Sequence, residues 1–331
     1  MGNNESKALK IAWLDVPAPE VERINRAMLP EGFVLERPLS RTDHEEHLRL
    51  VSDADFVMHT SIKLPSDMVR AMRQCKLIQK WGVGVDSIAV DTAAECGIPV
   101  AITAGANAVP VAELAVTLML TLYRRILVAD RNTRSGVWLN AQLRTQCFTL
   151  RGKKVGIVGI GNVGKHLARL LQGFGANVVY TDVRALDADE EAKLGIRFES
   201  LTDICETCDI ISLHVPMTPK TKHMIGENEI ARMKPNMILI NTARGGLIDE
   251  LALAKALEEK RIAGAGLDVQ EGGIPTADYH LSKFDNVVLT PHNGGGTLDN
   301  VEVVTRHAYG NMLKVLRGEP LDPRDIISPR G

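Results

Sequence analysis

An arginine and two histidines lie where they could act on a carbonyl group. Arg244, His292 and His214 each follow an apolar run that reads as a β-strand. A guanidinium can bind both oxygens of a 2-oxo acid through its planar fork. A neutral imidazole can take a proton from an alcohol, and imidazolium can return it to a ketone. We expect Arg244 to bind substrate, His292 to be the acid/base and His214 to line the cofactor cleft. Helix capping by Arg244 and purely local hydrogen bonds of His292 are the alternatives.

Three glycines between a strand pattern and a helix pattern have the spacing of a dinucleotide-binding turn. They are Gly159, Gly161 and Gly164. The first permits a tight turn, the second lets the backbone approach a pyrophosphate, and the third lets the helix pack closely on the sheet. The helix N-terminus would then face the phosphates with unpaired N–H groups. This motif, in its strand–turn–helix context, predicts a bound dinucleotide.

A carboxylate follows at the end of the next strand pattern. Asp182 lies 18 residues beyond Gly164, near the ~20-residue offset of an acidic residue that binds a ribose 2′-hydroxyl. A carboxylate repels the 2′-phosphate of NADP, so Asp182 favours NAD. Arg184 is close enough in the sequence to soften this preference.

A second glycine-rich turn could bind an anion. The segment Gly82–Gly84 follows a strand pattern, and its N–H groups could form a small nest for a carboxylate. Val83 and Gly84 are therefore candidate substrate contacts, together with Asn107. Lys80 precedes the turn and could bind a second anionic group, or be a solvated lysine at a strand end. Capping of the following helix is the alternative role for Asn107.

Apolar bursts alternate with helical stretches along the chain, which is the pattern of parallel βα units. We expect two doubly wound α/β domains: a Rossmann NAD-binding domain, 104–297, inserted into a flavodoxin-like substrate domain, 1–103 and 298–331. A long helix over Val111–Arg134 is predicted from the apolar spacing of Leu114, Leu118, Leu122 and Ile126. The strand patterns lie at Lys10–Leu14, Phe33–Arg37, Phe56–His59, Lys76–Trp81, Val100–Thr103, Val155–Gly159, Asn177–Asp182, Ile210–Leu213, Met237–Asn241, Ala263–Asp268 and Val287–Thr290.

Composition excludes several classes of protein. The 331 residues suffice for two domains, and the net charge of −2 gives no basic excess for nucleic acid. No run approaches the ~18 apolar residues of a membrane span, and Met1–Lys7 lacks the apolar core of a signal peptide. The five cysteines, an odd number, fit a reducing compartment, so we expect a cytoplasmic protein. Cys205 and Cys208 form a C-x-x-C pair on a predicted helix and are expected to be packed thiols; no metal site is expected.

Taken together, these motifs resemble the D-isomer-specific 2-hydroxyacid dehydrogenase family over nearly the whole chain. The segments that carry the likeness are Gly82–Asp86, Asn107, Val111–Glu113, Gly159–Gly164, His214–Pro216, Thr242–Asp249, Gly264–Val269 and Thr290–His292. The resemblance implies a split substrate domain around an inserted NAD domain, with Arg244 binding substrate and His292 as acid/base. It also implies a homodimer formed through the region of the long helix. The sequence ends at Gly331, so no appended regulatory domain like that of longer phosphoglycerate dehydrogenases is expected.

The resemblance also extends the set of expected cofactor contacts. Asp268 would contact the nicotinamide amide. The full set is Gly159, Gly161, Asn162, Val163, Gly164, Asp182, His214, Pro216, Thr242, Ala243 and Asp268.

One position departs from the family pattern. The family places a catalytic glutamate five residues beyond the aspartate that matches Asp268, where it orients the histidine and stabilises its charged form. That position is Gly273 here. Glu271 is near in sequence and could substitute through a different loop path, so we include it among the candidate catalytic residues. Without such a carboxylate, the pKa of His292 would not be raised by that route.

Two functions are consistent with these observations. The first is an NAD-dependent 2-oxoacid reductase whose substrate is of the 3-phosphoglycerate, hydroxypyruvate or glyoxylate type. The second is a catalytically weak regulatory protein that senses NAD(H) on the same fold. Gly273 supports the second function, and the presence of Arg244 and His292 opposes it.

Overall fold

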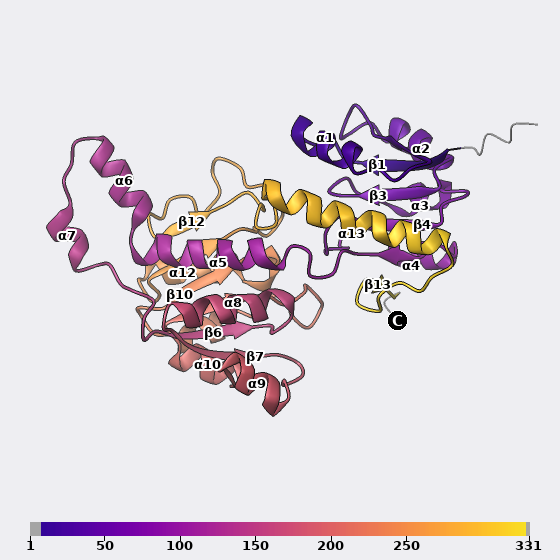
Figure 1. The fold of residues 1–331 in the computed structure, drawn as a ribbon. Coiled ribbons are helices and arrows are strands. Elements are labelled where there is room, and N and C mark those ends of the chain that lie inside the picture. The colour runs from indigo at the N-terminus through magenta and orange to yellow at the C-terminus, as the bar shows by residue number, and fades with distance from the viewer. Residues whose placement is uncertain (1–7, 329–331) are drawn as a thin grey trace, which may run out of the picture. The chain divides into compact units, whose positions relative to one another are not determined.

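A computed structural model describes residues 8–328, and within it the chain forms two compact units (Figure 1). Unit 1 comprises Met1–Asn107 and Gly296–Gly331, and unit 2 comprises Ala108–Gly295. The predicted α/β class with two doubly wound sheets is confirmed. The functional boundaries at 103/104 and 297/298 stay predictions. The segment weighed for a signal peptide, 1–7, lies outside the described residues. No helix within 8–328 has the length and apolar character needed to cross a membrane.

Unit 1 is built on a sheet with the strand order β13-β5-β4-β3-β1-β2, parallel except for β13. The order reverses between β1 and β3, as in flavodoxin-like folds. Its strands are β1 (Leu9–Leu14), β2 (Phe33–Glu36), β3 (Phe56–His59), β4 (Leu77–Lys80), β5 (Val100–Ala101) and β13 (Ile326–Ile327). Its helices are α1 (Pro19–Ala27), α2 (His44–Ser52), α3 (Ser66–Ala71), α4 (Val90–Glu95) and α13 (Leu298–Leu316).

Successive side chains of β1 enter two different cores, because neighbouring residues of a strand point to opposite faces of the sheet. Ile11 and Trp13 join one apolar cluster, and Ala12 and Leu14 join the other. Helix α13 packs against the first of these clusters through Tyr309 and its neighbours, which brings residues near the C-terminus onto strand β4. Both faces of the sheet are therefore covered by helices.

Strand β3 ends in a histidine that is fully buried, and this predicts a pH-dependent stability. Burial, assisted by the charge of Lys80, lowers the pKa of His59 to about 3. The unfolded chain thus binds more protons than the folded chain between about pH 6.5 and pH 3. The contribution of His59 to the free energy of unfolding is therefore fully present above pH 6.5. It falls by about 1.4 kcal/mol per pH unit as the pH drops through this window. Urea titrations at pH 7 and pH 5 should show a smaller loss for His59→Gln than for the wild type. The exposed His44 gives the control His44→Gln, and equal losses in all three proteins would contradict the prediction.

Unit 2 is built on a wholly parallel sheet with the order β12-β11-β10-β9-β6-β7-β8. Its strands are β6 (Lys154–Val158), β7 (Asn177–Thr181), β8 (Arg197–Phe198), β9 (Ile210–Leu213), β10 (Ile238–Asn241), β11 (Gly264–Leu267) and β12 (Val287–Leu289). Its helices are α5 (Ala108–Tyr123), α6 (Ile126–Arg134), α7 (Asn140–Arg144), α8 (Asn162–Gly173), α9 (Ala188–Leu194), α10 (Leu201–Thr207), α11 (Glu227–Arg232) and α12 (Glu250–Glu258), with a 3₁₀ turn at Gly245–Leu247. From β6 the strands are added first toward one edge of the sheet (β7, β8) and then toward the other (β9 to β12), so the strand order reverses between β6 and β9. Ligands of such sheets bind beyond the carboxyl ends of the strands at that point.

The structure corrects the prediction of one long helix over Val111–Arg134. Helix α5 ends at Tyr123, and Arg125 adopts a left-handed backbone with φ 52° before α6 begins. A left-handed residue cannot continue a right-handed helix. Helix α7 and the two-residue strands β8 and β13 are further elements that the sequence did not predict. The thiols of Cys205 and Cys208 are fully buried, as predicted, and burial raises the pKa of each to about 12.

Candidate active site

The glycine turn of unit 2 lies at the point where the strand order of the sheet reverses. Gly159 follows β6 with φ +100°, and a Cβ there would lie 2.7 Å from the carbonyl oxygen of His214, just beyond β9. A Cβ on Gly164 would clash with the carbonyl oxygen of Gly159. Only glycine fits at these two positions, because each is closed by backbone atoms. By contrast, a Cβ on Gly161 would meet nothing within 4 Å, so the middle of the turn is open.

The predicted ribose-binding carboxylate lies beside this turn. Asp182 directly follows β7, and its carboxylate accepts hydrogen bonds from the backbone N–H of Ile160 (2.7 Å) and of Val183 (2.7 Å). Ile160 lies between the first two glycines of the motif. The carboxylate is thus held at the edge of the open part of the turn.

A buried asparagine shapes the turn that carries Arg244. The side-chain amide of Asn241, at the end of β10, donates to the carbonyl of Arg244 (2.8 Å), and its oxygen accepts from the N–H of Ala243 (3.0 Å). Arg244 is half-buried, and its guanidinium donates to the carbonyl of Ala243 (2.6 Å). Inside this turn the hydroxyl of Thr242 is buried and has no hydrogen-bond partner among the residues that the structure describes.

Asp268 holds the loop that carries His292. This aspartate directly follows β11 and is 1% exposed. Its carboxylate accepts three hydrogen bonds: from the hydroxyl of Thr290 (2.6 Å), the N–H of Asn293 (3.0 Å) and the N–H of Gly294 (2.9 Å). His292 lies between these donors, is exposed and has φ +53°. The sequence predicted that Asp268 lies near the cofactor, but it gave no sign of this bracing role.

Arg244 and His292 emerge at the same edge of one sheet. Arg244 follows β10 and His292 follows β12, and β11 lies between these strands. Since all three strands are parallel, their carboxyl ends share one edge. Asp268 sits between the two loops at that edge.

Glu271 has a partner that the sequence did not suggest. Its carboxylate lies 2.8 Å from Nε2 of His223, and its backbone N–H donates to the buried carboxylate of Glu250 (2.7 Å). The backbone N–H of His223 in turn donates to the carbonyl of Gly246, in the turn after Arg244. Glu271 therefore braces the Arg244 turn through His223, while its predicted role beside His292 stays a prediction.

His214 and Pro216 follow β9, next to the glycine turn. Burial lowers the pKa of His214 to about 4, and its Nε2 lies 2.8 Å from the hydroxyl of Ser212. An imidazole with this pKa is neutral at physiological pH and has no second proton to donate to a ketone. This supports the choice of His292, rather than His214, as acid/base.

The predicted substrate contacts of unit 1 lie beyond the carboxyl ends of its strands. Val83 and Gly84 are half-buried in the loop after β4, and Asn107 directly precedes α5. Lys80 is buried, and its amine donates to the carbonyl of Thr60 and lies 3.4 Å from Nδ1 of His59. Lys80 is thus a packed residue at the end of β4, and not a solvated one.

The residues of unit 2 fit a dinucleotide. Gly161 is the N-cap of α8, and no side chain caps that helix, so its first N–H groups face the open part of the turn. The buried hydroxyl of Thr242 lacks a partner that a ligand could supply. Within residues 8–328, no group of three or more His, Cys, Asp or Glu could hold a metal ion.

Comparisons with known proteins identify the family of this chain. The model of the "D-isomer specific 2-hydroxyacid dehydrogenase, NAD binding domain" matches residues 116–294. A glyoxylate reductase of Thermococcus litoralis is 37% identical over 93% of this chain and 87% of its own length. A D-3-phosphoglycerate dehydrogenase of Methanocaldococcus jannaschii is 38% identical over 83% of this chain, which spans only about half (52%) of that protein. A solved structure of a Thermus thermophilus protein superposes with a TM-score of 0.83, at 29% identity over 97% of this chain and 100% of that one.

The matched segment contains the glycine turn, Asp182, the Arg244 turn and the His292 loop. The chain therefore belongs to the D-isomer-specific 2-hydroxyacid dehydrogenase family, NAD-dependent oxidoreductases that act on the CH–OH group of 2-hydroxy acids.

Proposed function

We propose that this protein reduces a small 2-oxo acid of the glyoxylate or hydroxypyruvate type, or oxidises the corresponding 2-hydroxy acid such as 3-phosphoglycerate. Residues 104–297 would bind NAD, and 1–103 with 298–331 would form the substrate domain. When bound, NADH supplies the hydride. Arg244 holds the carboxylate and the ketone oxygen of the substrate, and His292 donates a proton to that oxygen as the alcohol forms. Val83, Gly84, Asn107 and Lys80 contribute to substrate binding.

The observation that carries this proposal is the triple hydrogen bonding of Asp268. A buried carboxylate with three donors fixes the backbone on both sides of His292, and the neighbouring strand β10 presents Arg244 at the same edge. Fixing an acid/base and an anion-binding group at one edge of the same sheet is what proton transfer to a bound 2-oxo acid requires. Asp182 supports NAD as the cofactor, because its carboxylate would repel a 2′-phosphate.

The test is NADH oxidation by the purified protein with a panel of glyoxylate, hydroxypyruvate, phosphohydroxypyruvate and larger 2-oxo acids. We expect turnover with at least one small member, and weaker turnover with NADPH than with NADH. NADH binding without turnover across the panel would instead support the NAD(H)-sensing function. That second candidate rests on Gly273, which stands where the family has its glutamate.

The Glu271–His223 contact leads to a prediction about pH. Glutamine at position 271 can still accept a hydrogen bond from His223, so Glu271→Gln should leave kcat at neutral pH nearly unchanged. If Glu271 acts only by bracing the Arg244 turn, the pH profiles of kcat for reduction and for oxidation should match those of the wild type. A displaced limb in either profile would show that Glu271 takes part in proton transfer.

We further propose a homodimer formed through helices α5 to α7. No residue of α6 is buried, and Leu127 and Trp138 are 55% and 76% exposed. Figure 1 shows α6 and α7 standing away from the sheet of unit 2. Large apolar side chains left exposed in this way favour an interaction surface over a solvated one. The five cysteines are all unpaired, which supports the cytoplasm as the compartment.

A charge introduced into the segment from α6 to α7 (126–144) should separate the subunits; this segment is called the arm below. We expect Trp138→Asp to elute as a monomer in size-exclusion chromatography with light scattering, because the carboxylate would be buried at the interface without a partner. Leu251→Asp is the matched control, since Leu251 is an exposed (73%) apolar residue on α12 of the same unit. Monomers from both variants, or dimers from both, would argue against the arm as the interface.

A further inference from the structure

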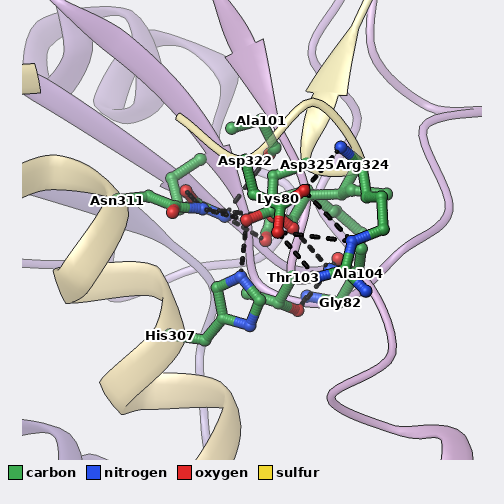
Figure 2. Close-up of polar contacts among 12 residues, drawn as sticks. Lys80, Gly82, Ala101, Thr103, Ala104, His307, Asn311, Asp322, Arg324 and Asp325 are labelled. Carbon is green, nitrogen blue, oxygen red and sulfur yellow. Dashed lines mark hydrogen bonds and ion pairs between the residues drawn. The ribbon is translucent and has the colours of Figure 1, made fainter. Parts of the chain in front are cut away.

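A buried carboxylate near the C-terminus lies at the centre of a polar network in unit 1 (Figure 2). Asp325 is 2% exposed and directly precedes β13. One carboxylate oxygen accepts from the backbone N–H of Ala104 (2.9 Å). The other is hydrogen-bonded to Nε2 of His307 (2.7 Å) and to the side-chain amide of Asn311 (3.4 Å), both on α13. This carboxylate therefore ties α13 to the segment that follows β5.

Two series of hydrogen bonds, called routes below, connect Asp325 to the loop after β4. The first runs through the backbone beyond β5. The N–H of Ile102 donates to the backbone carbonyl of Asp325 (2.8 Å). Together with the bond from Ala104, Asp325 therefore accepts hydrogen bonds from the residues on both sides of Thr103. The hydroxyl of the fully buried Thr103 accepts from the N–H of Gly82 and donates to its carbonyl, each at 3.1 Å. The N–H of Thr103 also donates to that carbonyl (2.9 Å). Gly82 adopts φ +132° at the start of the glycine loop.

A second route reaches the same loop through Asn311. Its amide donates to the side chain of the buried Gln79 on β4 (3.1 Å), and the amide of Gln79 donates to the carbonyl of Lys80 (2.8 Å). Lys80 is the last residue of β4, immediately before the loop. The two routes thus begin at one carboxylate and end on either side of Trp81.

Anchoring the C-terminal strand does not require a buried charge at position 325. β13 pairs with β5 through two residues, and an apolar side chain at position 325 would fill the same space without a buried charge. A buried carboxylate is costly unless its oxygens are hydrogen-bonded. Here those bonds are made to the end of β5 and, through α13, to β4, and they converge on the loop that contains Val83 and Gly84.

From this convergence we propose that Asp325 is a positioning residue for the 2-oxo acid: it sets the backbone of Gly82–Gly84 so that the N–H groups there can receive the substrate carboxylate. The proposal rests on the proposed function of that loop. Asp325 itself does not touch the substrate. Its loss should therefore weaken substrate binding, while cofactor binding by unit 2 stays intact.

The test compares Asp325→Asn with Asp322→Asn. Both replace a carboxylate by its amide three residues apart, but Asp322 pairs with the exposed side chain and the N–H of Arg324. We expect Asp325→Asn to raise KM for the 2-oxo acid by about tenfold, the effect of losing one charge-assisted hydrogen bond. kcat and the Kd for NADH should change little. Asp322→Asn should resemble the wild type throughout.

A second variant breaks the first route at another point, and a second measurement does not depend on turnover. Thr103→Val should raise KM for the 2-oxo acid in the same way. Thr103→Ser, which keeps the hydroxyl, should have a KM close to that of the wild type. In hydrogen exchange followed by mass spectrometry, Asp325→Asn should speed exchange in the peptide that covers Gly82–Asp86 but not in β1.

The outcomes separate this inference from the proposed function. If the wild type reduces no 2-oxo acid, the proposed function fails, while faster exchange at Gly82–Asp86 would still show the coupling from Asp325. A fall in thermal stability with unchanged KM and unchanged exchange in the loop would mean that Asp325 only anchors the C-terminal strand, and would overturn the inference. Faster exchange with unchanged KM in an active enzyme would overturn the substrate-positioning role.

Discussion

Asparagine in place of His292 is expected to lower kcat for 2-oxo acid reduction by about 10³-fold, within the range contributed by a general acid. Asparagine suits this position because, like histidine, it tolerates a left-handed backbone, and His292 has φ +53°. The loop itself should persist, since the carboxylate of Asp268 holds it through Thr290, Asn293 and Gly294, which the substitution leaves in place. Steady-state kinetics with the best 2-oxo acid, and the Kd for NADH from fluorescence titration, check both parts of the expectation.

The control for this variant is His44→Asn, which removes an exposed histidine of unit 1 and should leave kcat unchanged. Added imidazole should restore part of the lost activity in the His292 variant if the missing group is a proton donor. A kcat equal to that of the wild type would remove His292 from the mechanism.

Replacing Arg244 by glutamine should reduce kcat/KM by about 10²-fold, mainly through KM. Two parallel charge-assisted hydrogen bonds to the substrate would be lost, and each is worth about 1.5–3 kcal/mol before compensation. Lysine should be nearly as poor, because an ammonium group cannot span two oxygens as a guanidinium can. The Kd for NADH should stay close to that of the wild type, since Arg244 is assigned to substrate.

Arg232→Lys is the matched control for Arg244→Lys. Arg232 lies in the same unit and forms an exposed ion pair with Glu206 (2.8 Å), so its replacement should not alter kcat/KM. If Arg244→Lys keeps full activity, bidentate binding by Arg244 is excluded. If the NADH affinity falls in parallel with kcat/KM, the turn around Thr242 has collapsed and Arg244 has a structural role.

Much of the architecture could be predicted because it depends on short segments of the sequence. Each parallel strand is an apolar run covered on both faces, and the glycine turn is a local motif. The break in the predicted long helix could not be seen in this way. The apolar spacing through Leu118, Leu122 and Ile126 continues across Arg125, so the periodicity of side chains gives no sign of a left-handed backbone there. Strands β8 and β13 are too short to show any pattern.

The site was harder to predict than the fold, because it depends on which strand ends are neighbours. Arg244 and His292 could be placed after strands from local sequence. The three donors to Asp268 lie 22 to 26 residues further along the chain and become its partners only because β12 pairs with β11. The same reasoning applies to Asp325 and Ala104, which are separated by 221 residues. The His223–Glu271 contact likewise joins two loops with no shared sequence signal.

The two glycines after Glu271 restrict which side chains could replace them. Gly272 and Gly273 have φ +84° and +99°, conformations in which a glutamate would be strained. A glutamate at position 273 would therefore require this turn to adopt a different backbone conformation. Placing a carboxylate there by substitution would therefore cost folding free energy, unless the neighbouring residues of the turn changed as well.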